Sequence, residues 1–213
     1  MPITRRDFLG SFGAASIAAA VPPGAAEAST RLPLNEAWDT TWVERVKGKY
    51  RAVFDSPGFS DGAALFRAAV WSRDYKEVYG TAAADMSAVL VVRHQGIWLA
   101  MNDDFWRKYS VGKRQKFKDD KKQWYERNPI ASVSGSPMDI DISKFIKEGN
   151  IVLACHLAFG QVVERVRKEN PSAKEDPETV ARAYLLPGVI LQPSGVFAAL
   201  RAQEAGCHYI LAS

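Results

Sequence analysis

Three side chains in the sequence could take part in thiol chemistry. Cys155 ends an apolar run, NIVLAC, and is followed directly by His156 and by the helical pattern LAFGQVVERVRKEN. His94 ends a second apolar run, SAVLVVRH. A cysteine at the N-terminus of a helix can form a thiolate near neutral pH, because the free backbone N–H groups there favour negative charge. Either histidine could influence the protonation of the Cys155 thiol, and His94 could activate the sulfur as a nucleophile.

The same residues also have a structural interpretation. Free cysteine is among the most buried residue types, so Cys155 could simply fill space, and His94 could be a satisfied structural histidine. As zinc or copper ligands, Cys155, His156 and His94 lack CxxC or HxxxH spacing, and adjacent residues seldom face one ion. The chain also lacks GxGxxG, GxSxG, phosphate-loop and CxxCH motifs. We therefore expect no metal and no cofactor, and the residues alone leave the reactivity of Cys155 open.

A disulfide between the two cysteines of the chain, Cys155 and Cys207, is not expected. Cys155 ends its apolar run, whereas Cys207 begins the last one, CHYILA. In parallel strands these positions lie at opposite ends, roughly 15 Å apart at about 3.3 Å per residue. That separation is beyond the reach of a disulfide, so we expect two free thiols.

Apolar runs separated by helical patterns predict the elements that would position these side chains. Continuous rather than alternating apolar runs are typical of strands buried on both faces of a parallel sheet. The pattern predicts a single-domain α/β fold with about five mostly parallel strands and helices on both faces. Strands are expected at 50–56, 87–94, 150–155, 188–193 and 207–212, with 97–102 either a short strand or the edge of a pocket. Helices are expected around Trp42, through 65–70 after a cap at Ser60 or Asp61, and at 103–109, 141–149, 156–170, 176–185 and 194–206. Asp176 and Ser194 are the expected caps of the last two, and Leu157, Val162, Val163 and Val166 form the apolar face of 156–170.

The segment 103–139 differs from the rest of the chain, because it is polar, rich in aromatic residues and, after a short first helix, without clear periodicity. Residues 105–127 hold nine Lys or Arg and three acidic residues, interleaved with six aromatic residues. A loop of this length in a compact domain is usually a lid, a contact surface or an insertion. A solvated loop, a subunit contact and an entrance that attracts small anions are the alternatives, and nucleic acid is not an expected partner.

The N-terminus has the pattern of a twin-arginine export signal. Arg5 and Arg6 precede Phe8 and Leu9, an apolar run follows from Ser11 to Val21, and Ala26 and Ala28 have the spacing of a cleavage site. The apolar run is much shorter than the roughly 20 residues that span a bilayer. We expect cleavage after Ala28, a mature domain at 29–213 that contains no membrane span, and a periplasmic or secreted location. The net charge of +4 is too small to predict a general affinity for nucleic acid.

Two features resemble the DsrE/DsrF-like sulfur-relay family. One is the strand–Cys–helix unit IVLACHLAF, and the other is the C-terminal stretch GVILQPSGVFAALRAQEAGCHYIL. The resemblance implies a compact α/β fold with a five-stranded, largely parallel sheet and assembly into trimers or hexamers. In the sulfur-carrying members, a cysteine at this junction holds sulfur as a persulfide and passes it to a partner, which would be the role of Cys155. The export signal and the insertion at 103–139 depart from the pattern of the family.

Two main hypotheses about function follow, and a metal-binding redox protein is a third option. In the first, an exported DsrE-like protein binds or transfers sulfur through Cys155, with His94 or His156 tuning protonation and a donor or acceptor protein as partner. In the second, the chain is a non-enzymatic homo-oligomer that binds a small ligand or a protein beneath the lid. The resemblance leaves open whether the chain is an enzyme, such as a sulfur-transferase-like carrier.

Overall fold

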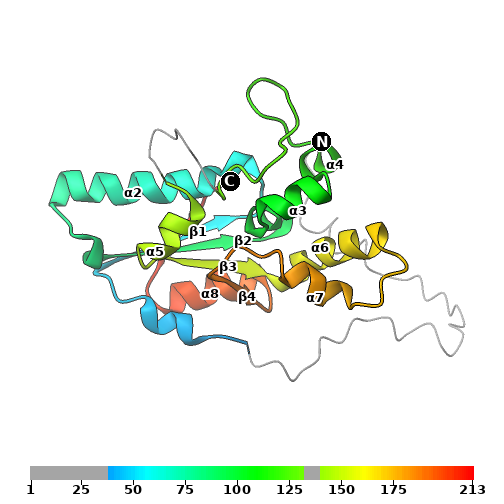
Figure 1. Cartoon of the computed structure of the whole chain (residues 1–213). Coiled ribbons are helices and arrows are strands. Elements are labelled where there is room, and N and C mark those ends of the chain that lie inside the picture. Colours follow the sequence, from blue (N-terminus) through cyan, green and yellow to red (C-terminus); the bar gives the residue numbers. More distant parts are fainter. Residues whose placement is uncertain (1–37, 132–139) are drawn as a thin grey trace, which may run out of the picture. The chain divides into compact units, whose positions relative to one another are not determined.

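The protein folds around a sheet of five parallel strands in the order β4-β3-β2-β1-β5. A computed structural model describes residues 38–131 and 140–213 (Figure 1). The predicted export signal at 1–28, the following residues up to 37, and residues 132–139 of the predicted insertion lie outside the described residues. The strands are β1 (Tyr50–Ser56), β2 (Met86–Val92), β3 (Ile151–Cys155), β4 (Val189–Gln192) and β5 (His208–Leu211).

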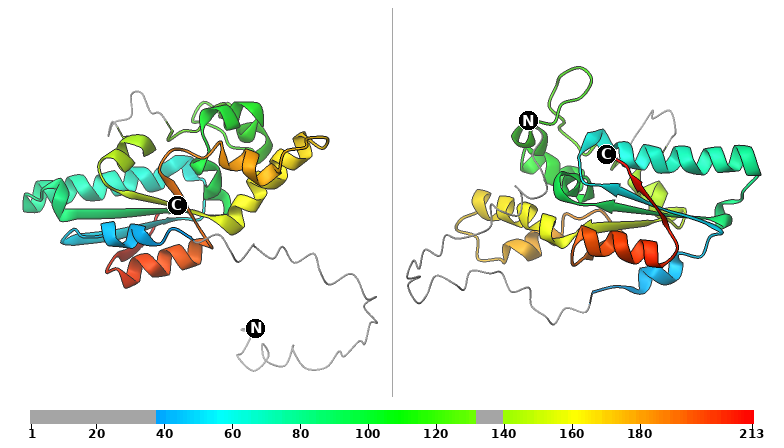
Figure 2. Two further views of the ribbon diagram at one scale, coloured as in Figure 1. Left: turned by 60° about the horizontal axis from the view of Figure 1, so that its bottom comes forward. Right: turned by 180° about the vertical axis from the view of Figure 1, so that it is seen from behind.

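Helices cover both faces of this sheet, as the sequence predicts (Figures 1 and 2). One face packs against α2, α5 and α6, and the other packs against α8 and the short 3-10 helix η1, which buries Trp42. The α-helices are α2 (Ala63–Tyr79), α3 (Asp103–Lys108), α4 (Val111–Gln115), α5 (Ile142–Lys147), α6 (His156–Glu169), α7 (Pro177–Arg182) and α8 (Gly195–Glu204). The 3-10 helices are η1 (Thr41–Arg45), η2 (Ser60–Gly62), η3 (Ala83–Asp85) and η4 (His94–Ala100).

The three central strands are apolar because both of their faces are covered. Val53, Val89 and Leu153 point toward α8, while Phe54, Leu90 and Val152 point toward the opposite core, and all six are at most 1 % exposed. The parallel register pairs Val53 with Val89 and Val91 with Leu153. Since all five strands run in one direction, their carboxyl ends share one edge, where ligands bind in sheets of this kind.

The structure differs from the sequence-based expectation at residues 97–102. Residues 97–100 belong to the 3-10 helix η4, and the chain is buried from Gly96 to Met101. Gly96 lies directly against the end of β1, where an added Cβ would be 2.2 Å from the carbonyl oxygen of Ser56. Because the chain must turn beneath β1 at this close approach, it cannot continue as a strand.

Two further expectations about helices are wrong. Neither Ser60 nor Asp61 caps α2, because both have positive φ in the tight turn η2 and Gly62, with φ of +79°, occupies the cap position. Leu157 does not belong to the buried face of α6, since 67 % of it is exposed. It lies in the first turn of α6 on the side opposite to the buried Ala158 and Phe159. By contrast, Asp176 and Ser194 cap α7 and α8 as expected.

The inserted segment has more local structure than its sequence pattern indicates. It contains α3 and α4, followed by a hairpin-like return in which Lys118 and Trp124 form an antiparallel bridge. Among the described residues, no helix is both long and apolar enough to cross a bilayer.

Candidate functional site at the end of strand β3

Cys155 occupies the junction that the sequence predicts, as the last residue of β3 and the N-cap of α6. Its Sγ accepts a hydrogen bond from the backbone N–H of Ala158 at 3.4 Å. The sulfur therefore lies at the positive end of a 14-residue helix. Cys155 is 6 % exposed and is part of the hydrophobic core on the side of the sheet that α2, α5 and α6 cover, while the adjoining Leu157 is largely open to solvent.

His156 is adjacent to this sulfur in sequence and has a fixed ring. Its Nε2 lies 3.0 Å from Oε1 of Glu178, and the edge of Trp38 packs against the ring at a centroid distance of 5.3 Å. A carboxylate can only accept, so Nε2 carries a proton. The other ring nitrogen, Nδ1, is buried and has no hydrogen-bond partner among the described residues. His156 can therefore still offer a lone pair or a proton to a bound group.

Glu178 holds the ring through a network of its own. Burial raises the pKa of this carboxyl, but hydrogen bonds from His156 and Arg182 outweigh that effect, so its pKa is lowered overall. Arg182 donates from Nε at 3.0 Å and from Nη2 at 2.7 Å to Oε1 of Glu178, the atom that also accepts the hydrogen bond from Nε2 of His156. Glu178 is consequently anionic near neutral pH and stabilises a proton on Nε2 of His156.

Gln192 is the neighbour of Cys155 across the sheet, where the two residues are register partners. Its side chain is fully buried and donates from Nε2 to the carbonyl oxygens of Asp39, at 2.7 Å, and Leu191, at 2.9 Å. Its Oε1 has no partner among the described residues. A buried polar atom without a partner typically costs about 1–3 kcal/mol, so Oε1 of Gln192 and Nδ1 of His156 would each gain from a further polar partner.

His94 lies at the same edge of the sheet but does not join this group. It follows β2, is exposed, and has a φ of +49° at the start of η4. Within the described ranges no hydrogen bond links His94 to Cys155. The structure thus brings together Cys155 and His156 from the three candidate residues and adds Glu178, Arg182 and Gln192.

A second polar cluster at this edge went unnoticed in the sequence. Asp55 in β1 is 1 % exposed and accepts from Nε and Nη2 of Arg93 at 2.8 Å each and from the hydroxyl of Tyr209 at 2.6 Å. The hydrogen bond to Asp55 raises the pKa of both partners. The bidentate pair packs beneath α8, where a Cβ on Gly195 would come within 2.6 Å of the Cβ of Arg93. The sequence signal for this cluster is Asp55, the one acidic residue in the apolar run YRAVFDS.

The second cysteine differs in its surroundings. Cys207 precedes β5, and burial raises the pKa of its thiol to about 11, against a smaller opposing effect of Arg51. It therefore remains protonated near neutral pH. Both cysteines are free, as predicted. No group of three or more His, Cys, Asp or Glu side chains in the described part of the chain is arranged to hold a metal ion.

Comparison of the chain with protein-family models, with curated proteins and with solved structures returned no match.

Proposed function

We propose that the protein is an exported sulfur carrier, similar to the DsrE/DsrF-like family, that holds a sulfur atom on Cys155 as a persulfide and passes it to a partner. The observation that carries this proposal is the hydrogen bond from the Ala158 N–H to Sγ of Cys155 at the N-cap of α6. This position puts the partial positive charge of a helix N-terminus at the sulfur, and the five-stranded parallel sheet is the fold that the resemblance implies.

Loading needs no net oxidation if the donor is itself a persulfide. The Cys155 thiolate attacks the outer sulfur of R–S–SH, the S–S bond of the donor breaks, and a new S–S bond forms on Cys155. The proton of the donor moves to the departing thiolate, which leaves as R–SH. Delivery to an acceptor thiolate is the same exchange in reverse.

The surroundings of Cys155 suit a persulfide. The added sulfur extends the side chain by about 2 Å, which moves the negative charge from Sγ to the outer sulfur, beside the residues next to Cys155. Nδ1 of His156, when protonated, is a donor without another partner and could bind that atom. The low exposure of Cys155 limits the attack of water on a bound persulfide.

Mass spectrometry of the intact protein tests this proposal. We expect glutathione persulfide to add about 32 Da, the mass of one sulfur, to the folded wild-type protein. Cys207→Ser is the matched control and should keep the adduct, whereas Cys155→Ser should lose it. A wild-type protein that takes up no sulfur, or an adduct on Cys207 alone, would overturn the proposal.

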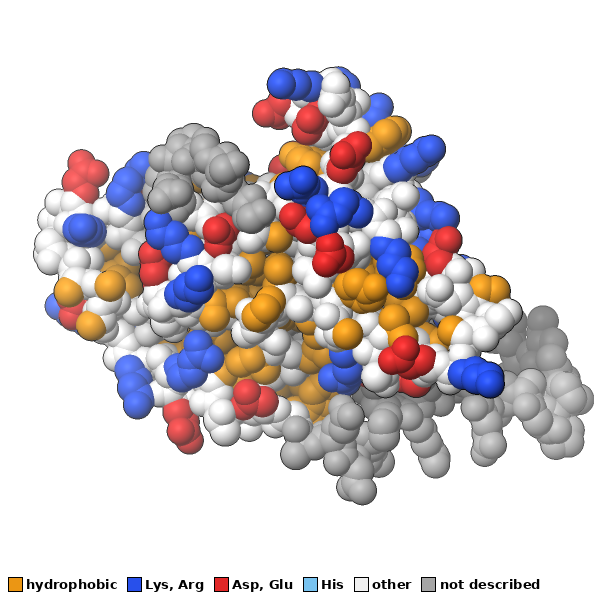
Figure 3. Space-filling view, in the orientation of Figure 1, with side chains coloured by type: hydrophobic (Ala, Val, Ile, Leu, Met, Phe, Trp, Pro, Cys, Tyr) orange, Lys and Arg blue, Asp and Glu red, His pale blue; other side chains and the backbone are white. Residues whose placement is uncertain are grey.

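Self-association is part of the proposal, as trimers or hexamers. The two edge strands, β4 and β5, each lack an outer partner among the described residues. Val196 and Leu200 on α8 and Tyr209 and Leu211 on β5 are 45–61 % exposed. Figure 3 shows further hydrophobic side chains gathered over the part of the molecule where β4 and α8 lie. Apolar edges and faces of this kind favour contact with further copies.

The proposed location depends on the pair Arg5 and Arg6. Replacing both by lysine should leave the chain uncleaved in the cytoplasm of a host that has a twin-arginine pathway. The unchanged chain should appear in the periplasm as a species that begins after Ala28. Equal export of both forms would exclude this route.

A further inference from the structure

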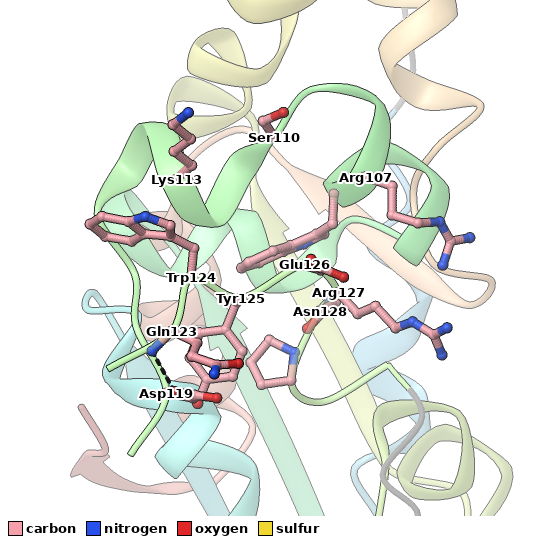
Figure 4. Close-up of a pocket in the computed structure, with 12 residues that line it drawn as sticks. Arg107, Ser110, Lys113, Asp119, Gln123, Trp124, Tyr125, Glu126, Arg127 and Asn128 are labelled. Atoms are coloured by element: carbon pink, nitrogen blue, oxygen red, sulfur yellow. Dashed lines mark hydrogen bonds between the residues drawn. The ribbon is translucent and has the colours of Figure 1, made fainter. Parts of the chain in front are cut away.

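The inserted segment encloses a cavity of about 950 Å³, which is separate from the Cys155 junction (Figure 4). The helices α3 and α4 form one side, and the returning segment 119–129 forms the other. Its volume lies in the range that accommodates a small organic ligand. Residues that line it include Trp106, Ser110, Lys113, Trp124, Tyr125 and Arg127.

The walls of this cavity are packed in place before any ligand binds. A Cβ on Gly112 in α4 would lie 2.0 Å from the carbonyl oxygen of Tyr125, so the two sides meet backbone to backbone. Phe117 stacks on Phe59 of the main core at 3.8 Å between ring centroids. Asn128 closes the segment by donating from Nδ2 to the carbonyl oxygens of Leu99 and Met101. A preformed cavity loses little conformational freedom on binding.

The charge around the cavity favours an anionic ligand. Residues 105–127 carry nine Lys or Arg and three acids, a local excess of 9 − 3 = +6. The lining itself has three cations, with Arg107 paired to Asp104, and two acids, Asp119 and Glu126. Lys113 and Arg127 are exposed and form no ion pair with any described residue.

The positions of these groups indicate the shape of the ligand. In Figure 4, Lys113 lies beside the indole of Trp124 at one end of the cavity. At the opposite end, the side chains of Arg107 and Arg127 project in the same direction. Trp124 is 39 % exposed, and Nζ of Lys118 lies 4.3 Å from the centroid of its ring, so a cation already covers one face and stacking is left to the other. Tyr125 supplies a hydroxyl that stays protonated, because burial and the nearby Asp61, Asp120 and Asp119 raise its pKa to about 12.

We propose that this cavity binds a planar aromatic carboxylate, with its ring stacked on Trp124 and its carboxylate on Lys113. Arg107 and Arg127, at the far end, donate hydrogen bonds to a second acidic group, so an aromatic dicarboxylate binds more tightly than a monocarboxylate. This site is independent of sulfur on Cys155, and nothing in its chemistry requires the persulfide.

Titration calorimetry of the full mature chain with three probes of similar shape tests the proposal. The probes are naphthalene-2,6-dicarboxylate, 2-naphthoate and neutral 2-naphthamide. We expect affinity to fall in that order, by about fivefold at each step. Equal affinity for the amide and the acids would overturn the assignment, because the cations would then contribute nothing.

Four variants at exposed positions locate the binding groups. Trp124→Ala should weaken all three probes by about tenfold, since stacking is shared. Lys113→Gln should weaken both acids, and Arg127→Gln should weaken the dicarboxylate alone. Lys121→Gln is the matched control, because Lys121 is exposed in the same loop but does not line the cavity. An equal loss in Lys121→Gln would mean that only the general positive charge acts, and would overturn the site.

Discussion

The Nε2 of His156 lies 3.0 Å from Oε1 of Glu178, and this contact ties the first residue of α6 to the first turn of α7. Glu178 thereby determines the orientation of the ring next to Cys155. Because Arg182 holds the same carboxylate oxygen from the next turn of α7, the ring is positioned by a short helix rather than by a loop.

Glu178→Gln tests this link through its pH dependence. The pKa of Glu178 is below its ordinary value of 4.5 in the folded protein, so its carboxylate contributes stability above that pH and loses it as the pH falls through the folded pKa. The variant should be less stable at pH 7 by about 1 kcal/mol or less, since the side chain is partly exposed, and the difference should shrink as the pH falls below 4.5. Urea denaturation at pH 7 and at a series of pH values below 4.5 measures it. Glu164→Gln, which removes exposed pairs on α6, is the control and should show a smaller difference.

The two thiols should differ in their reaction with iodoacetamide. Cys207 has a pKa of about 11 and is nearly all thiol at pH 7.5, whereas Cys155 has the helix N-terminus beside its sulfur. We expect Cys155 to be alkylated first, and the rate at Cys207 to rise about tenfold per pH unit up to pH 11. Peptide mass spectrometry over time gives both rates, and protein unfolded in urea should show nearly equal ones. Faster labelling of Cys207 in the folded state would contradict the proposed role of Cys155.

Tyr209→Phe should destabilise the protein by about 1–2 kcal/mol, because the buried carboxylate of Asp55 loses a charge-assisted hydrogen bond. The pKa of Tyr209 is raised above 10 in the folded state, so this contribution is fully present below pH 10 and is lost as the pH rises through the folded pKa. Urea denaturation at pH 7 and pH 11 measures both effects. Tyr79→Phe removes a hydroxyl from a largely exposed ring and should change neither value.

Much of the fold can be predicted from the sequence because strands buried on both faces must be continuously apolar. The bounds expected for β1 match the structure, as do the caps Asp176 and Ser194, since each depends on residues close together in the chain. The turn at Gly96 could not be predicted, because its cause is the approach of Ser56 from another strand. The site is similar: Cys155 stands out locally, but the bond between His156 and Glu178 spans 22 positions.

Gly112→Ala should be strongly destabilising and should abolish binding of 2-naphthoate. A methyl group cannot fit 2.0 Å from a backbone oxygen, so α4 and the segment at Tyr125 must separate. We expect a loss of about 1–3 kcal/mol in the free energy of unfolding. The control is Gly160→Ala in α6, where a Cβ would meet nothing within 4 Å. That change should stabilise the protein by up to about 1 kcal/mol, because alanine favours the helix. A stable Gly112→Ala variant that still binds would show that the two walls are mobile.

Leu200→Glu should convert the assembly to smaller species. The side chain is 54 % exposed on α8, and a charge there opposes burial against another copy. Analytical ultracentrifugation should report a trimer or hexamer for the unchanged protein and a monomer for the variant. Gln203→Glu adds the same charge at another exposed position of α8 and is the control. A wild-type protein that sediments as a monomer would contradict the proposed oligomer.

The pairing of β1 with β5 has a consequence for biosynthesis. Ala52 lies opposite His208 and Asp55 opposite Leu211. β1 is therefore synthesised well before β5, its partner on this side, is available for pairing. Until β5 is synthesised, one edge of β1 has unpaired amide and carbonyl groups, which can form β-pairs with another chain. If the chain uses the proposed twin-arginine route, which carries folded proteins, the docking of β5 would be the step that makes it ready for transport.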